Sequence, residues 1–214
     1  MSEQNSNGTI RYDKITRPVV VQANYIASRK DKHWVDDFIS DYTGCMPWNW
    51  GTPPISHTEV GFWLDGDLWF FSSTSRKELG GKNGTRWIKG NELLRNPKRW
   101  KLQENKFDIC NGADYEIRIE IYRANDLIGL EYDFYGVGAD FINPLRVMFA
   151  HYTVIEVIKK LKKIYCSKAV HAVETGKLAV YSPRRQYKWA KNNEFEDIKD
   201  TAAYVTKETI KSRV

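Results

Sequence analysis

Three residue types in this chain could together cleave an amide or acyl bond: a cysteine, a histidine and a carboxylate. Cys166 begins a segment whose apolar residues recur at positions 166, 169, 170 and 173, a spacing that predicts a buried helix. Gly176 supplies a plausible helix stop. In the first turn of a helix, unpaired backbone N–H groups and the positive end of the macrodipole favour a thiolate over a thiol. Cys166 is therefore either a nucleophile or an ordinary buried cysteine, depending on whether a base lies beside it.

His57 is the best candidate for that base. It lies near the start of the segment Ser56–Leu64, which has the composition of a strand. Because side chains alternate along a strand, His57, Glu59 and Gly61 should point to one face. Burying a histidine and a glutamate there without partners would be costly, so the two groups predict either a site or a solvent-exposed pair at the strand edge.

The other histidines are expected to lie elsewhere. His171 follows Cys166 by five positions, which is about 140° around a helix, so it should face away from the thiol. His33 and His151 stand beside charged or loop segments and are expected at the surface.

Composition limits the other classes of function. The three cysteines, Cys45, Cys110 and Cys166, are widely spaced without a C-x-x-C motif, which argues against a disulfide framework and a structural zinc site. We therefore expect no metal and no cofactor. The net charge of +6 comes from 33 basic and 27 acidic residues that are interspersed, a pattern that does not indicate nucleic-acid binding. The sequence has neither an apolar run of membrane-span length nor a signal peptide, so synthesis in a cytoplasm is predicted.

The pattern predicts one domain at 17–193, with a flexible polar tail at 1–16 and a charged C-terminal tail or helix at 194–214. Predicted strands lie at Pro18–Ala23, Ser56–Leu64, Leu68–Ser72 and Trp100–Leu102, with an Asp65-Gly66-Asp67 hairpin turn. Predicted helices lie at His33–Tyr42, Asn91–Arg95, Tyr152–Lys163 and from Ser182-Pro183 onward.

The remaining segments indicate loops or leave two alternatives open. Residues 73–86 are polar and indicate a loop, and 127–141 indicate a loop followed by a helix. Tyr115–Tyr122 fits a strand by its alternation, yet apolar residues at 117, 121, 124 and 128 fit a helix. Trp48 and Trp50, in a segment rich in proline, either line a groove or close the edge of the core.

Several short motifs occur in an order that carries a resemblance to a known family. They are Ser56-His57-x-Glu59, Phe71-Ser-Ser-Thr-Ser-Arg76, Gly84-Thr-Arg86, Tyr132-Asp133-Phe134-Tyr135-Gly136 and Tyr165-Cys166-Ser167-x-Ala-Val170. Over roughly residues 18–190, the set resembles the circularly permuted NlpC-type papain-like cysteine hydrolases, in the YiiX-like branch, and looks closest to versions carried by bacteriophages.

The resemblance implies an α+β fold in which a helix presents Cys166 against a curved antiparallel sheet that carries His57. It implies a thiol hydrolase that acts without a metal on amide bonds, including those of peptidoglycan peptides. An acyltransferase or thioesterase on the same dyad, and an inactive module that contacts a host or other phage proteins within a virion, are the alternatives.

The third catalytic residue departs from the family pattern. Relatives tend to place a glutamate on the strand after the histidine strand, whereas this chain offers only Ser72 or Ser73 there. Glu59 is the alternative, from the same strand as His57. The candidate substrate contacts are residues of the motifs and of the tryptophan-rich loop: Tyr132, Asp133, Tyr165, Trp48 and Trp50.

Overall fold

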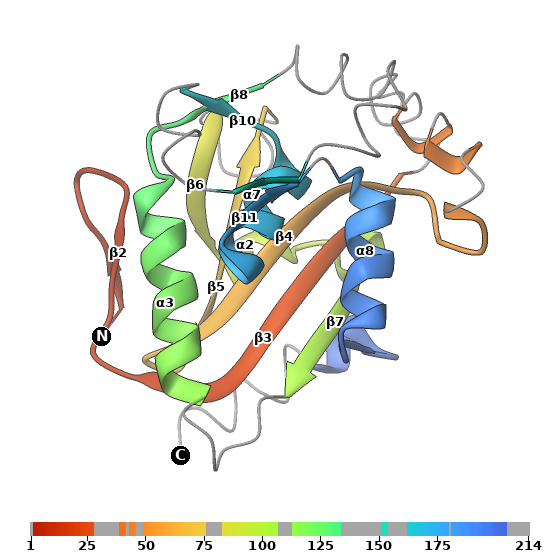
Figure 1. The fold of residues 1–214 in the computed structure, drawn as a ribbon. Helices are drawn as coiled ribbons and strands as arrows, with labels where there is room; N and C mark the ends of the chain where they lie inside the picture. Colours follow the sequence, from red (N-terminus) through yellow and green to blue (C-terminus); the bar gives the residue numbers. More distant parts are fainter. Residues whose placement is uncertain are drawn as a thin grey trace.

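A six-stranded antiparallel sheet, in the order β12-β7-β3-β4-β5-β6, forms the centre of the molecule (Figure 1). The computed structural model describes residues 2–27, 39–41, 43–45, 49–75, 83–106, 113–133, 151–153, 162–179 and 181–204. The strands of this sheet are β3 (Ile15–Ile26), β4 (Ile55–Leu64), β5 (Asp67–Thr74), β6 (Gly84–Lys89), β7 (Trp100–Lys106) and β12 (Glu196–Asp197). The sheet is curved, and the mixed α+β class agrees with the sequence prediction.

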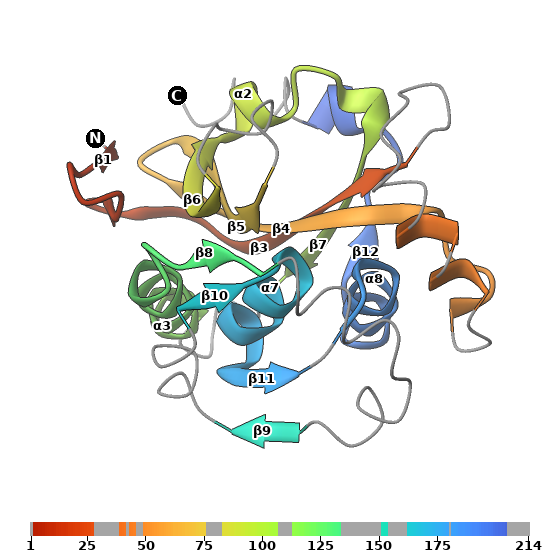
Figure 2. The same cartoon turned by 90° about the horizontal axis from the view of Figure 1, so that it is seen from above.

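Helices cover one face of the sheet in a single layer, as Figure 2 shows. They are α3 (Ala113–Asp126), α7 (Cys166–Thr175) and α8 (Pro183–Asn192). The short helix α2 (Gly90–Leu93) and the 3-10 turn η4 (Pro97–Arg99) connect β6 to β7. Three two-stranded sheets complete the described fold: β1 (Glu3–Gln4) with β2 (Ile10–Arg11), β8 (Glu131–Tyr132) with β10 (Lys163–Ile164), and β9 (His151–Thr153) with β11 (Lys177–Ala179).

Alternation along β4 divides the core into two clusters, one on each face of the sheet. Val60, Phe62 and Leu64 belong to the cluster that includes the apolar residues of α3 and α7. Trp63 belongs to the cluster on the opposite face, with Phe70 of β5. Every residue of β4 is buried, so its polar side chains, which belong to Ser56, His57, Thr58 and Glu59, must find hydrogen-bond partners inside the protein.

The β4–β5 hairpin forms as its turn sequence predicts. Leu64 pairs with Asp67, so Asp65 and Gly66 make a two-residue loop, and both have positive φ, of 50° and 90°. Two positive φ angles are characteristic of the type I′ turn that matches the twist of the flanking strands, and Asp-Gly is among its preferred sequences.

The two helices that the sequence predicted near the C-terminus are confirmed. Helix α7 begins at Cys166 and is followed by Gly176, which adopts the left-handed conformation (φ 69°) that glycine tolerates without strain. Helix α8 begins at Pro183, and the Ser182 hydroxyl accepts a hydrogen bond from the Arg185 N–H at 3.2 Å.

The first residues differ from the predicted flexible tail, because tertiary contacts hold them. Ser2 is buried: its hydroxyl donates to the Leu64 carbonyl (3.2 Å) and accepts from the Trp69 indole N–H (2.9 Å). Ile10 is buried in the core, and its backbone exchanges two hydrogen bonds with the Asn125 side chain on α3.

Other differences follow from strand pairing that local sequence does not encode. The predicted loop at 73–86 ends in β6, which pairs with β5 from Gly84 onward. The predicted helix at Tyr152–Lys163 begins and ends in strand residues, and 154–161 lie outside the described residues. For Tyr115–Tyr122 the helical alternative is the right one, because residues 117, 121 and 124 face the core.

The C-terminal segment joins the main sheet. Its strand β12 pairs with β7, Phe195 is buried, and residues 201–204 are helical, whereas 205–214 lie outside the described residues. Of the predicted helix at His33–Tyr42, only 39–41 are described, and they are helical. None of the helices that the structure describes combines the length and hydropathy of a membrane span.

Candidate active site

His57 and Glu59 lie on one face of β4 and contact each other directly. The His57 Nε2 and Glu59 Oε1 atoms are 2.9 Å apart, and the two side chains are 3% and 0% exposed. The expectation that the two residues share a strand face therefore agrees with the structure. Two residues that are two positions apart on one strand point the same way, which does not favour a short contact between their side chains. In this structure the two side chains nevertheless make a direct hydrogen bond.

Arg86 of β6 holds the other side of the same carboxylate. Its guanidinium donates to Glu59 Oε1 at 2.6 Å and to Oε2 at 3.1 Å, and the Arg86 side chain is 4% exposed. This bidentate arrangement orients the carboxylate and stabilises its ionised form in a buried place.

Cys166, the first residue of α7, completes a row of polar side chains. A hydrogen bond joins its side chain to His57, and the backbone N–H groups of Thr58 and Ser167 also stabilise its sulfur. Because Nε2 of His57 is bound to Glu59, Nδ1 is the ring nitrogen that remains for the thiol. The row therefore runs Cys166, His57, Glu59, Arg86.

The electrostatics of this row favour a thiolate–imidazolium pair. Burial raises the pKa of Cys166, but the charge and hydrogen bond of His57 outweigh it, so the net direction is downward. Burial likewise would lower the pKa of His57, whereas Cys166 and Glu59 raise it to about 9. For Glu59, burial raises the pKa, and Arg86 and His57 bring it below its ordinary value. Each group thus stabilises the charged form of its neighbour.

Two serine hydroxyls fix the segment around the cysteine. Ser73 of β5 donates to the Ile164 carbonyl at 2.6 Å, which ties the strand that precedes α7 to the sheet. Ser167 donates to the Tyr181 carbonyl, which links the start of α7 to the residue before the α8 cap. The start of α7 is therefore held from both sides.

Ser72 and Ser73, considered above as orienting groups for His57, are engaged with backbone carbonyls. Ser72 Oγ donates to the Thr58 carbonyl at 2.8 Å, and Ser73 Oγ to Ile164 as described. The group that contacts His57 Nε2 is the Glu59 carboxylate.

The candidate substrate contacts occupy different places. Tyr165 is 1% exposed and has the Lys168 Nζ atom 5.6 Å from its ring centroid, so it is a core residue beside the cysteine. Tyr132 pairs with Ile164 across the parallel β8–β10 ladder, and the Asp133 N–H donates to the Ile164 carbonyl at 3.3 Å. Both are partly buried next to the segment that leads into Cys166.

Trp50 is 68% exposed, and the structure does not bring it to the row of polar side chains by any described contact, while Trp48 lies outside the described residues. The ring of Trp100 instead stands edge-on to His57, with centroids 6.4 Å apart.

The other predicted site features are as follows. His171 lies on a different face of α7 from Cys166, with its ring 4.4 Å from Tyr181 and 5.1 Å from Trp189. His33 lies outside the described residues, and His151 is in β9. In the described part of the chain, no group of three or more His, Cys, Asp or Glu side chains could hold a metal ion.

Arg86 is the member of the row whose role sequence reasoning missed. It belongs to the Gly84-Thr-Arg86 motif, but no role followed from that motif. The available signal was an arginine within the apolar strand segment Gly-Thr-Arg-Trp-Ile. A guanidinium buried in such a strand needs an anionic partner, and Glu59 is that partner.

No family model, curated protein or solved structure matches the chain.

Proposed function

We propose that this protein is a cysteine hydrolase in which Cys166 is the nucleophile, His57 the acid and base, and Glu59 the group that orients His57. One observation carries the proposal: Cys166, His57 and Glu59 are hydrogen-bonded in sequence inside the protein. A nucleophile beside a base that a third group orients is the arrangement of thiol and serine hydrolases on many folds.

The reaction would begin with attack of the Cys166 thiolate on a carbonyl carbon. The carbonyl oxygen then carries the negative charge, next to the N–H groups at the start of α7. The His57 imidazolium gives its proton to the leaving amine, the C–N bond breaks, and a thioester to Cys166 remains. His57 next takes a proton from water, whose oxygen attacks the thioester, and the carboxylic acid leaves as the thiolate is restored.

Burial supports this role for the row. Because His57, Glu59 and Arg86 are each less than 5% exposed, their mutual attraction is little screened by water. Arg86 keeps Glu59 ionised, and ionised Glu59 holds the ring of His57 by Nε2, which leaves Nδ1 for the hydrogen bond to Cys166. The protein thus holds its charges in position before a substrate arrives.

The location of nucleophile and base in the chain supports membership of the permuted papain-like hydrolases. In the arrangement that the family implies, the histidine strand precedes the cysteine helix, and here β4 precedes α7. We extend the proposal to an amide substrate, with peptidoglycan peptides as the first class to test. Asp133, beside the segment that leads into Cys166, is the candidate for recognising a substrate amine.

The absence of an orienting carboxylate on β5 was the feature that favoured an inactive module. Glu59 supplies an orienting carboxylate from β4 instead, because its Oε1 atom is 2.9 Å from His57 Nε2. This contact favours a hydrolase over an inactive interaction module.

The decisive experiment compares the wild type with Cys166→Ala, His57→Ala and the double variant. Substrates are peptidoglycan-derived peptides and a small activated acyl ester, and the acyl-enzyme is sought by mass spectrometry. Since residues that act as a unit are non-additive, each single variant should lose most of the turnover and the double variant little more. Turnover or acylation that survives in Cys166→Ala, or single losses that multiply in the double variant, would refute the mechanism.

A further inference from the structure

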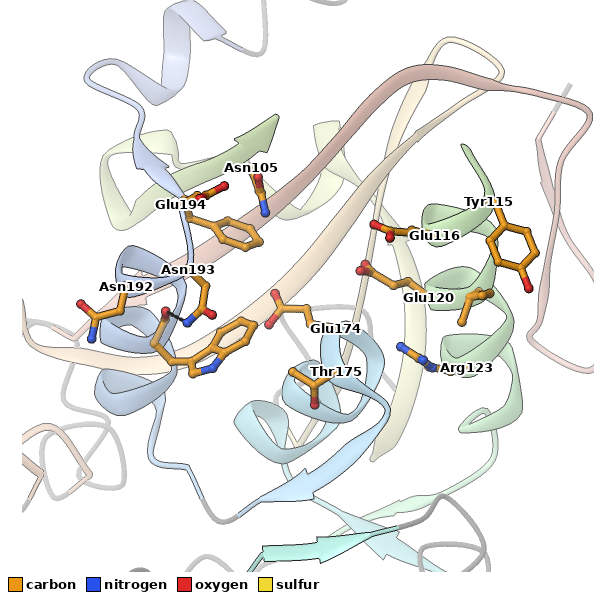
Figure 3. A pocket seen from close by; sticks show the side chains of 13 residues that line it. Asn105, Tyr115, Glu116, Glu120, Arg123, Glu174, Thr175, Asn192, Asn193 and Glu194 are labelled. Carbon is orange, nitrogen blue, oxygen red and sulfur yellow. Dashed lines mark hydrogen bonds between the residues drawn. The ribbon is translucent and has the colours of Figure 1, made fainter. Parts of the chain in front are cut away.

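A cavity lies away from the candidate active site, at the opposite end of α7. Its volume is about 650 Å³, within the range of small-molecule pockets, and Figure 3 shows it between α3, α7 and α8. At 1.5 Å per residue, the last turn of α7 is about 13 Å from Cys166. The lining residues that matter below are Tyr115, Glu116, Glu120, Glu174, Trp189 and Phe195.

Carboxyl groups from two facing helices point into this cavity. Glu116 and Glu120 are one turn apart on α3, Glu174 is on α7, and Figure 3 shows Glu120 and Glu174 directed toward the same space. Glu194 adds a fourth carboxyl group at the rim. Glu116 and Glu194 are exposed, whereas Glu120 is buried and Glu174 half-buried, and a buried glutamate is unusual unless it is paired.

The decisive feature is the hydrogen-bonding state of two of these groups. Glu120 is 8% exposed, and its Oε2 atom has no hydrogen-bond partner among the described residues. Glu174 Oε2 accepts from Gln186 Nε2 at 2.6 Å, but its Oε1 likewise has no partner in the described part of the chain. Buried polar oxygens are normally satisfied, so two unsatisfied carboxyl oxygens at one cavity indicate a missing donor.

The cationic side chain in the lining, Arg123, is committed elsewhere. Its Nη1 atom donates to the Val173 carbonyl at 3.0 Å, and its guanidinium packs against Gly176, where an added Cβ would lie 2.9 Å from Nη2. Arg123 therefore closes the C-terminal end of α7, and its hydrogen bond goes to a backbone carbonyl and not to a carboxyl group of the cavity.

Aromatic rings form another part of the wall. Trp189 of α8 lies 6.5 Å from Phe195, centroid to centroid, and Tyr115 of α3 is 70% exposed at the mouth. Aromatic faces beside carboxylates suit an organic cation, because the rings contact methylene groups and attract positive charge. A metal ion fits less well, since these carboxyl groups do not form a cluster that could hold one among the described residues.

We propose that this cavity binds the alkylammonium group of an organic amine, with Glu120 and Glu174 as hydrogen-bond acceptors and Trp189 and Phe195 against the alkyl chain. The ammonium group has three donors, enough to reach both unsatisfied oxygens. This proposal does not depend on the chemistry at Cys166.

Binding should release protons. Burial raises the pKa of Glu120 to about 8, and burial together with Glu120 raises the pKa of Glu174 well above its usual value. At pH 7 Glu120 therefore holds a proton in most molecules of the protein alone. A bound ammonium group favours the ionised forms of both carboxyl groups, so binding should transfer protons to the buffer.

The test is calorimetric titration with 1,5-diaminopentane at pH 7 in two buffers of different ionisation enthalpy, with 1-pentanol as the neutral comparison. We expect the diamine to bind with buffer-dependent heat and the alcohol not to bind. Glu120→Gln and Glu174→Gln should each weaken binding by about tenfold or more, the loss typical of a hydrogen bond to a charged group. Glu92→Gln, which removes an exposed carboxylate on α2, is the matched control and should bind as the wild type does.

Each other outcome overturns the proposal. Diamine binding that Glu120→Gln and Glu174→Gln leave unchanged would be adventitious surface binding, and absence of binding to the wild type, or binding of Mg²⁺ in its place, would exclude an amine site. The glutamine variants should remain folded because they replace buried acids by neutral isosteres, which thermal unfolding would check. Cys166→Ala should bind the diamine unchanged, which separates this proposal from the hydrolase proposal.

Discussion

Arg86 and Glu59 are hydrogen-bonded across an intervening strand. Phe71 of β5 pairs with Val60, so Ser72 and Glu59 come next along the antiparallel strands, and Ser72 pairs with Arg86. The small side chain of Ser72 lets the guanidinium pass over β5 and reach the carboxylate at 2.6 and 3.1 Å. The lowered pKa of Glu59, the carboxylate that contacts His57, thus depends on a residue two strands away.

Loss of Arg86 should destabilise the protein and disturb the site together. Arg86→Met leaves the Glu59 carboxylate buried without its cation, and breaking a buried pair in this way costs about 3–5 kcal/mol. Denaturant unfolding measures the loss in the free energy of unfolding. Arg86→Lys keeps the positive charge but cannot make the bidentate hydrogen bond, so its free energy of unfolding should lie between those of Arg86→Met and the wild type. The double variant Arg86→Met, Glu59→Gln should recover part of the stability. Equal stability of Arg86→Met and the wild type would show that the ion pair contributes nothing.

The role proposed for Glu59 in turnover can be tested separately from its contribution to stability. Glu59→Gln should lower kcat by about 10²–10⁴, by analogy with the change of a triad carboxylate to an amide. Steady-state kinetics on a cleaved substrate would check this. A change confined to KM would instead mean that Glu59 contacts substrate and does not orient His57.

The thiol of Cys166 should ionise at a lower pH than an ordinary cysteine. The lowered pKa predicts that Cys166 is alkylated by iodoacetamide at pH 6–7, where an ordinary thiol reacts slowly, and that His57→Ala removes this reactivity. Peptide mapping gives the rate of alkylation of each cysteine as a function of pH, and the exposed Cys45 serves as the internal comparison. Because Cys166 is buried, the pH dependence is the diagnostic quantity: parallel pH profiles for the two cysteines would contradict the ion pair.

The pKa of His57 predicts how activity ends at high pH. As the pH rises through about 9, His57 loses the proton that the leaving amine needs, while Cys166 stays ionised. For an amide substrate, kcat/KM should therefore fall above about pH 9, and for an activated ester, whose leaving group needs no proton, it should not. Identical alkaline limbs for the two substrates would show that His57 is not the acid.

Gly61 should tolerate no side chain, because the strand that carries His57 and Glu59 passes close to Phe70. A Cβ at Gly61 would lie 2.5 Å from the Phe70 ring. Gly61→Ala should destabilise the fold by about 1–3 kcal/mol, the usual cost of overpacking. Thermal unfolding would measure it, and Phe70→Leu in the same chain should relieve part of the strain. If Gly61→Ala unfolds like the wild type, the ring moves without cost.

The local sequence was sufficient to predict an element where the conformation of that element depends on its own residues. The apolar spacing and Gly176 located α7, and the alternation along β4 placed His57 and Glu59 on one face. The Asp65-Gly66 turn located the hairpin for the same reason, since its backbone angles depend on its own residues.

Contacts between distant segments were not available from the sequence. Arg86 reaches Glu59 only because β5 separates β4 from β6 in the sheet. Ser2, at the polar start of the chain, becomes buried through the Trp69 indole, and β10 forms because β8 supplies a partner for its backbone. Polar composition predicted a flexible tail around Ser2 and a helix that extends to Lys163, and at Ser2 and Lys163 tertiary pairing outweighed it.

The order of β4 and α7 along the chain has a consequence for synthesis on the ribosome. The strands β3 to β7 emerge before Cys166, so a nascent chain can pair the strands that carry His57, Glu59 and Arg86 while it still lacks the cysteine. The Ser73–Ile164 and Ser167–Tyr181 hydrogen bonds that hold the start of α7 require residues that emerge with it or later. On a translating ribosome the Cys166–His57 contact can therefore form only after α7 has followed the strands out of the exit tunnel, so the row of polar side chains is assembled later than the strands that carry His57, Glu59 and Arg86.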